Sequence, residues 1–327
     1  MIKKLPFFYH PTAAIFVDDQ ESFIHSTLAI VDNLTDCRSF LDPKEALKYI
    51  KSVDVGAYFV SALKQEDQER LVLIPQKALA KYMGSLDRFL LETTLIIDYA
   101  MPKLNGVELC EAIEKKNFKK IMLTGEAGSD IAVEALNNHL IDRFIHKNSP
   151  KVFEELNQAL LELRAQFFEA FGQEISVHMT TLPAFLSTEA FSEFFRQMFN
   201  KLKGVEYYLI NRLGDFLIFD EQGHATWLCM RDKEGQDYTR NMLEAQNKKK
   251  PSEDLIFALD HLNNGKYLLV YGFGDVTKNV RDWVLPANTI KFDRHSCHYA
   301  TLPVKLDMKI QPLALQKPQY ALNRDGV

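Results

Sequence analysis

Cysteine is scarce in this sequence, and its few copies lie far apart. Four occur among 327 residues: Cys37, Cys110, Cys229 and Cys297. None stands in the paired spacing of a structural zinc site or of a disulfide framework. His295 and His298 flank Cys297, but no second group of ligands accompanies them, so a structural role at a strand end is favoured over a metal site. We expect reduced thiols and a cytoplasmic protein.

Long hydrophobic runs and a strong excess of one charge are also missing. No apolar run reaches the roughly 20 residues of a membrane-spanning helix. The first residues, MIKKLPFFYHPT, contain too few apolar positions for a signal peptide. The formal net charge of −5 gives no bulk attraction to nucleic acid or to an anionic membrane. We therefore expect no membrane partner, and the sequence does not favour nucleic acid as a partner.

The first half of the chain alternates short apolar runs with stretches of helical spacing. The runs predicted as strands are 13–17, 37–41, 95–97, 121–123 and 143–146. Between and after them, the segments predicted as helices are 21–31, a helix opening at Pro43, 107–115, 130–138 and a long helix after Pro150. This alternation predicts an α/β fold, with a five-stranded parallel sheet and helices on both faces.

Polar residues follow four of these strands at the point where each ends. They are Asp18 and Asp19, Asp98, Thr124 and Lys147. The carboxyl ends of parallel strands meet at one edge of a sheet, so these side chains should converge there. Three neighbouring carboxylates repel one another, and a hard divalent cation such as Mg²⁺ relieves that repulsion. With an ammonium and a hydroxyl beside them, the set suits in-line phosphoryl transfer onto a carboxylate.

These residues, together with the run DYAMPKLNG at 98–106 and Gly125 after Thr124, resemble the receiver-domain signature of bacterial two-component response regulators. The resemblance covers about the first half of the chain and implies a flavodoxin-like receiver fold. It implies that Asp98 is the phosphoacceptor, served by a sensor histidine kinase or a phosphotransfer protein. It also implies that Asp19, Asp98 and the backbone carbonyl of Ala100 bind Mg²⁺, while Asp18 acts largely through water.

The same resemblance implies roles for the residues around the phosphoryl group. Thr124 and Lys147 would bind its oxygens. Phe144 would rotate when Thr124 moves, although a fixed core aromatic explains this residue equally well. Ala100 and Glu126 occupy the positions that tune dephosphorylation, and because alanine cannot orient an attacking water, we expect slow self-dephosphorylation.

Two features depart from the receiver pattern. Asn148 follows Lys147 where the family has proline, and residues 51–93 replace a short connection. A structureless loop of that length is not expected in a compact domain, so we predict a helix within 76–91 and a strand near 71–74. The insertion is either a surface decoration, which is favoured, or a docking or dimerisation element.

The second half has a different pattern. We divide the chain into a receiver at 1–150, a helical connector at 151–180, an α+β output domain at 181–310 and an irregular tail at 311–327. The apolar stripe of the connector fits either a dimer contact or packing against the second domain. In the output domain, the predicted strands are 206–211, 215–219, 225–230, 267–271 and 299–304, with helices at 188–201, 237–246 and 254–262. This layout resembles a PAS-like module, and no helix-turn-helix is readable.

The sequence therefore predicts a response regulator of a phosphorelay that is not an enzyme beyond its own phosphorylation and dephosphorylation. Phosphorylation of Asp98 is expected to switch homodimerisation or partner binding through the C-terminal domain. The alternatives are a receiver that regulates a ligand-binding or catalytic output domain, and a DNA-binding regulator with an unfamiliar output fold.

Overall fold

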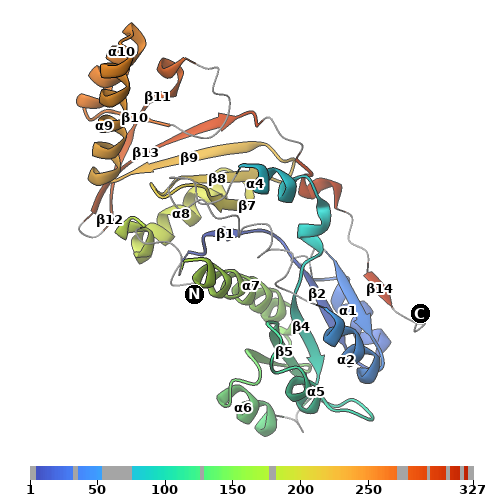
Figure 1. Cartoon of the computed structure of the whole chain (residues 1–327). Helices are drawn as coiled ribbons and strands as arrows, with labels where there is room; N and C mark the ends of the chain where they lie inside the picture. The colour runs from blue at the N-terminus through green and yellow to red at the C-terminus, as the bar shows by residue number, and fades with distance from the viewer. Residues whose placement is uncertain are drawn as a thin grey trace.

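Two six-stranded sheets form the framework of the molecule (Figure 1). The structure is a computed structural model that describes residues 5–31, 36–53, 76–125, 129–176, 182–270, 279–292, 295–306, 310–316 and 320–322. Within these ranges, no helix is long and apolar enough to cross a membrane.

The first sheet is parallel. In spatial order its strands are β14 (Tyr320–Leu322), β3 (Cys37–Phe40), β2 (Ala13–Val17), β4 (Glu92–Asp98), β5 (Lys119–Thr124) and β6 (Arg143–His146). All five residues of β2 are buried, as expected for a central strand covered on both faces. The five predicted strands are present in the flavodoxin-like order, which confirms the α/β receiver fold.

Helices cover both faces of this sheet. They are α1 (Glu21–Leu28), α2 (Pro43–Ser52), α5 (Gly106–Ala112), α6 (Ser129–Asn137) and α7 (Val152–Ser176). Residues of α1 and α7 pack in one apolar cluster on one face, and residues of α2, α5 and α6 pack in another on the opposite face. Local signals start two of these helices: the Asp42 side chain caps α2, and Asn105 forms a capping box with Glu108 at α5.

The second sheet is antiparallel. Its strands, in spatial order, are β1 (Phe8–Tyr9), β7 (Gly204–Leu209), β8 (Phe216–Asp220), β9 (Ala225–Arg231), β13 (His295–Val304) and β12 (Asn288–Phe292). An aromatic cluster joins one face to η3 (Ala184–Ser187) and α8 (Glu189–Lys201). The predicted α+β character of the second domain is confirmed, while its PAS-like resemblance stays a prediction.

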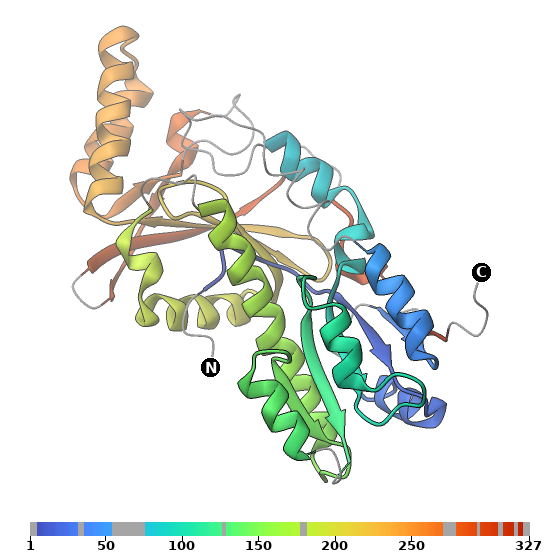
Figure 2. The same ribbon diagram turned by 60° about the horizontal axis from the view of Figure 1, so that its bottom comes forward.

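A small helical unit extends from the second sheet on the side away from the first sheet (Figures 1 and 2). It contains α9 (Lys233–Lys249), α10 (Glu253–Asn263), β10 (Tyr267–Leu269), η4 (Val280–Trp283) and β11 (Val284–Pro286). The basic run at 248–250 stands at the exposed end of α9.

The two ends of the described chain differ from the expected boundaries. Residues Phe8–Tyr9, expected within the receiver, form an edge strand of the second sheet beside β7. Residues Tyr320–Leu322, expected in an irregular tail, form β14 and add a sixth strand to the first sheet beside β3. Segments of two or three residues are too short for a hydrophobic period, and their partners are distant in sequence, so no local pattern predicts them.

The insertion contains the predicted helix. It appears as α4 (Gln76–Met83), followed by the 3-10 turn η1 (Leu86–Leu90), while the strand predicted near 71–74 lies outside the described residues. Leu156, Leu160, Leu163 and Phe167 of the apolar stripe of α7 are buried. Near the end of this helix, the Phe168 ring lies 5.3 Å from the Phe8 ring of β1, so this part of the helix packs against the second domain.

Candidate functional site

Three carboxylates meet at the carboxyl edge of the first sheet. Asp18 follows β2, Asp19 comes next, and Asp98 ends the adjacent strand β4. One oxygen of each lies within 4.8 Å of the others. Asp18 and Asp98 are buried and Asp19 is exposed, so the group opens to solvent through Asp19.

Asp98 combines burial with incomplete pairing. Its residue is 2% exposed, and its Oδ1 lies 2.9 Å from Lys147 Nζ. Its other oxygen, Oδ2, is buried and has no hydrogen-bond partner among the described residues. An unpaired buried carboxylate oxygen is costly, so this atom fits a site that receives a cation or a phosphoryl group.

Asp18 is held from two sides. Its Oδ1 accepts a hydrogen bond from the backbone N–H of Gln20 at 2.9 Å, and its Oδ2 lies 2.7 Å from Lys147 Nζ. Burial raises the pKa of Asp18 above its ordinary value, and the Lys147 ammonium offsets only part of that rise. The nearby Asp98 raises the pKa further. A divalent cation at this place would favour the ionised carboxylates.

Lys147 and Thr124 complete the site from the two following strands. Lys147 comes directly after β6, and its backbone N–H donates to the carbonyl of Thr124 at 2.8 Å. The Lys147 ammonium also lies 4.6 Å from the centre of the Phe23 ring on α1. Thr124 is fully buried, and its hydroxyl donates to the Gly125 carbonyl at 2.6 Å.

The loop after Asp98 is fixed by a close backbone contact. The backbone N–H of Gly106 donates to the Tyr99 carbonyl at 3.0 Å. A Cβ at Gly106 would lie 2.5 Å from the Asp98 carbonyl oxygen, so only glycine permits this approach. At Gly125, by contrast, an added Cβ would meet nothing within 4 Å, which leaves room beside Asp98 and Thr124. The loop leaves Ala100 exposed next to the carboxylates.

The sequence does not predict one ion pair that the structure places at this edge. Lys103, in the loop after Asp98, adopts a left-handed φ of 71°, and its ammonium lies 2.6 Å from Asp42 Oδ2. The hydrogen bond from Lys103 lowers the pKa of Asp42. Asp42 also follows a strand, β3, and this position could have indicated a place at the same edge. Its role as the cap of α2 is a sufficient explanation of an aspartate there.

Three further positions that the sequence singles out are Phe144, Glu126 and Cys297. Phe144 is half-buried on β6, with its ring 5.5 Å from that of His146, and both interpretations of Phe144 stay open. Glu126 lies outside the described residues. Cys297 is buried while the exposed side of its strand carries His298, whose Nδ1 lies 3.2 Å from Thr289 Oγ1. Adjacent strand positions face opposite ways, which favours the structural role.

The donor set fits a magnesium ion. Asp18, Asp19 and Asp98 supply carboxylate oxygens, and Ala100 has its carbonyl in the adjoining loop. Mg²⁺ prefers such oxygen ligands and retains waters that a phosphoryl oxygen can replace. Within the part of the chain that the structure describes, no other three His, Cys, Asp or Glu side chains converge in this way.

Comparison with known proteins finds a relative by structure. The sequence matches no protein family and no curated protein. The response regulator LqsR of Legionella pneumophila superimposes with a TM-score of 0.75 and 28% identity, covering 94% of each chain. A receiver domain from Clostridium thermocellum covers 47% of this chain and 95% of its own, with 16% identity and a TM-score of 0.32. Over nearly its whole length, the chain is therefore structurally similar to a bacterial response regulator.

Proposed function

We propose that this chain is the response regulator of a phosphorelay and that Asp98 accepts a phosphoryl group from a sensor histidine kinase or a phosphotransfer protein. The observation that carries the proposal is the buried Asp98 carboxylate, one oxygen of which has no hydrogen-bond partner among the described residues, beside two further aspartates and the Lys147 ammonium. This makes the chain a signalling protein that acts on its own Asp98 and not on a separate substrate.

The chemistry follows from the positions of these groups. An oxygen of Asp98 attacks the phosphorus atom, the bond from phosphorus to the donor imidazole nitrogen breaks, and the nitrogen keeps the electron pair. The product is an acyl phosphate. Lys147, which lies beside Asp98, neutralises charge on the phosphoryl oxygens, and the Thr124 hydroxyl can turn from the Gly125 carbonyl towards one of them. Asp19, Asp98 and the Ala100 carbonyl would hold Mg²⁺ directly and Asp18 through water, and the bound ion would neutralise charge during transfer.

A partner protein can reach this edge. The arrowheads of β2 and β4, where the carboxylates stand, point away from the second sheet (Figure 1). The exposed residues Asp19 and Ala100 lie at the same edge. The second domain therefore leaves the way to Asp98 open for a phosphoryl donor.

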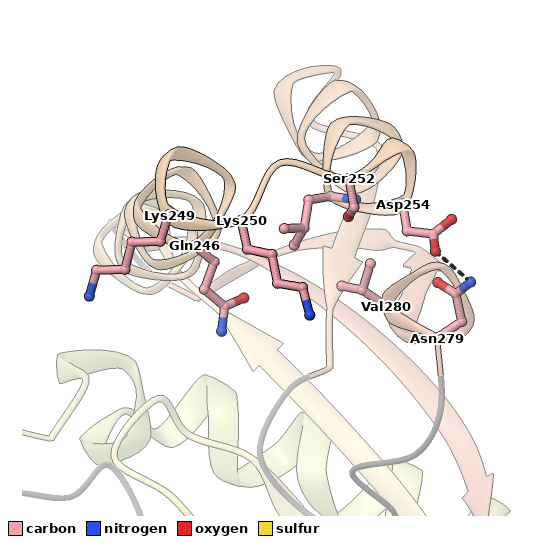
Figure 3. A pocket seen from close by; sticks show the side chains of 8 residues that line it. Gln246, Lys249, Lys250, Ser252, Asp254, Asn279 and Val280 are labelled. Atoms are coloured by element: carbon pink, nitrogen blue, oxygen red, sulfur yellow. Dashed lines mark hydrogen bonds between the residues drawn. The ribbon is translucent and has the colours of Figure 1, made fainter.

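The proposed output is homodimerisation or partner binding through the C-terminal domain, for which a PAS-like architecture remains our working description. One observation favours the alternative of a ligand-binding output domain. An open surface pocket of about 570 Å³ lies between the end of α9, the start of α10 and η4. Figure 3 shows Gln246 and Lys250 on its α9 side, opposite Asn279, whose amide is hydrogen-bonded to Asp254. A regulator that binds DNA through an unfamiliar fold is the third candidate.

Incubation with acetyl phosphate and Mg²⁺ tests the proposal. Intact-mass measurement should show one added phosphoryl group on the wild type and on Asp130→Ala, an exposed control on α6, and none on Asp98→Ala. Chelation of Mg²⁺ should stop the reaction. Equal labelling of Asp98→Ala would contradict the assignment.

Light scattering with BeF₃⁻ and Mg²⁺ tests the output. The wild type should increase in mass and Asp98→Ala should not. An unchanged mass in both would contradict a dimeric output. The Ala100 and Glu126 positions predict a slow loss of the phosphoryl group, and a half-life of a few seconds would contradict that expectation.

A further inference from the structure

The receiver and the C-terminal domain share one continuous hydrophobic core. A single buried cluster includes Ile15 and Ile97 from the first sheet and Leu217 and Trp227 from the second. The side chains that link the two parts of this cluster come from three separate elements or their flanks: Phe8, Tyr82, Met83, Phe167 and Phe168. Burial of this kind favours domains that remain in contact, because separation would expose the shared core.

The ends of the chain cross between the domains. Strand β1, which precedes the receiver in sequence, pairs with β7 of the second sheet. Strand β14, which follows the C-terminal domain, pairs with β3 of the receiver. The N-terminal end of the chain therefore supplies an edge strand to the second sheet, and the C-terminal end supplies one to the receiver sheet. Separation of the two domains would break the strand pairing at both edges.

Arg88, in the insertion, forms a buried ion pair with the second domain. Its guanidinium and the Glu206 carboxylate on β7 are both 0% exposed. The Nε and Nη2 groups of Arg88 donate to the two oxygens of Glu206 at 3.0 and 2.9 Å. The remaining donors reach the carbonyls of Met83, Ser85 and Gln311. All five N–H donors of the guanidinium are thus used, which is the condition for a stable buried charge.

Neighbouring polar groups extend this network around Arg88 and Glu206. The Tyr208 hydroxyl donates to Glu206 Oε2 at 2.9 Å. The Tyr82 hydroxyl lies 2.6 Å from Nε2 of His10, just after β1. The backbone N–H of Gln311, on the path to β14, donates to the Met83 carbonyl at 2.8 Å. The insertion, β7 and the C-terminal segment therefore meet in one buried network.

We propose that Arg88 locks the receiver and the C-terminal domain into one permanently docked unit, so that phosphorylation changes this unit without releasing the C-terminal domain. The insertion is then neither a surface decoration nor a site for another protein, because it fastens the receiver to its own output domain. The first part of the proposal rests on the shared core, the two crossing strands and the contacts of Arg88. Its second part rests on the proposed phosphorylation of Asp98.

The position of the lock connects it to the acceptor strand. The turn η1, which carries Arg88, ends at Leu90, and β4 runs from Glu92 to Asp98. Strand β4 is thus anchored next to the second domain at its start and carries the acceptor at its far end. A movement of β4 on phosphorylation would therefore be restrained at the start of the strand, where it adjoins the domain interface.

The first test compares three full-length variants without phosphorylation. Arg88→Met removes the lock, Arg88→Lys keeps the charge with fewer donors, and Arg196→Met removes an exposed pair with Glu193 as a control. Calorimetry should show one unfolding transition in the wild type, and Arg88→Met should lower the midpoint of this transition by several degrees. In hydrogen exchange, Arg88→Met should increase the exchange rates of residues 86–90 and of residues 204–209. Arg88→Lys should be intermediate in both measurements. Arg196→Met should match the wild type.

The second test uses small-angle scattering of the wild type and Asp98→Ala, with and without BeF₃⁻ and Mg²⁺, at protein concentrations at which light scattering shows a monomer. The proposal predicts no increase in the radius of gyration of the monomer in any of the four samples. Two separate unfolding transitions in the wild type, an Arg88→Met variant equal to the control, or an expanded monomer with BeF₃⁻ would each overturn it. If Arg88→Met fails to fold, Arg88→Lys and the wild-type measurements still decide. A failure of phosphorylation at Asp98 would leave the unfolding results unaffected, so the two proposals can fail separately.

Discussion

Two of the buried charge clusters among the described residues are built in opposite ways. At the carboxyl edge of the receiver sheet, one oxygen each of Asp18 and Asp98 and the ammonium of Lys147 lack a well-formed hydrogen bond among the described residues. At the domain interface, every N–H donor of Arg88 has an acceptor. Burial of charge alone therefore does not distinguish a functional site from a structural one.

The difference lies in hydrogen-bond satisfaction. A buried charge that is fully paired has no capacity left for a ligand, and it resists change because any alteration leaves its partner unpaired. A buried charge with free lone pairs is poorly stabilised until a cation or a phosphoryl group arrives. We therefore assign the Arg88 cluster to architecture and the Asp98 cluster to chemistry.

The largest expected effect comes from breaking the satisfied cluster. Glu206→Gln removes the negative partner of Arg88 and leaves a buried guanidinium uncompensated. We expect a loss of about 3–5 kcal/mol in the free energy of unfolding. Urea denaturation measures it, with the exposed Glu193→Gln as control. A Glu206→Gln variant within about 0.5 kcal/mol of wild type would contradict the structural assignment.

Changing the unsatisfied cluster should affect rate more than folding. Lys147→Met removes the only cation that the described residues place beside Asp98. By analogy with the loss of an oxyanion donor, phosphorylation by acetyl phosphate should slow about 10²–10³-fold. Initial rates measure this, and the exposed Lys151→Met should be unaffected. An equal rate in both variants would remove Lys147 from the chemistry.

The interface network predicts a pH dependence of stability. Burial lowers the pKa of His10 from 6.5 to about 3, so the folded protein holds this ring neutral. Above pH 6.5 the His10 ring is neutral in both the folded and the unfolded protein, so the burial of this ring takes nothing from the free energy of unfolding. As pH falls from 6.5 towards 3, only the unfolded state gains the proton, so the free energy of unfolding falls by up to about 1.4 kcal/mol per pH unit.

His10→Gln should remove this contribution, while the exposed His25→Gln should retain it. Urea denaturation at several values between pH 7.5 and 5 compares the slopes. Equal slopes for His10→Gln and wild type would show that His10 is not the responsible group.

The smallest expected effects concern two glycines beside Asp98. A methyl at Gly106 would collide with the Asp98 carbonyl, so Gly106→Ala should cost about 1–3 kcal/mol. A methyl at Gly125 meets nothing, so Gly125→Ala should stay within about 0.5 kcal/mol of wild type. Thermal unfolding separates the two. Equal stability of both variants would contradict the fixed loop geometry after Asp98.

The sequence predicts the parts of the molecule that depend on local patterns. The apolar run of β2 and the aspartates that follow it identify a strand end, and the order of five strands places Asp18, Asp98, Thr124 and Lys147 at one edge. The helix of the insertion, α4, follows from apolar residues at helical spacing, such as Leu79, Tyr82 and Met83. These predictions succeed because each residue carries its own periodic or positional signal.

Long-range pairing is what the sequence does not reveal. Arg88 and Glu206 are separated by more than a hundred residues, and each alone resembles an ordinary surface charge. Strand β14 has three residues and pairs with a strand near the other end of the chain. Such contacts arise from tertiary packing and leave no periodic trace, so the union of the two domains emerges only from the structure.

The central claim is that Asp98 carries the phosphoryl group. Treatment of the wild type with acetyl phosphate and Mg²⁺, reduction of the acyl phosphate with borohydride and peptide mass spectrometry would locate it directly. We predict that residue 98 alone is converted to homoserine and that the conversion disappears without Mg²⁺. Conversion at another aspartate with Asp98 unmodified would contradict the claim.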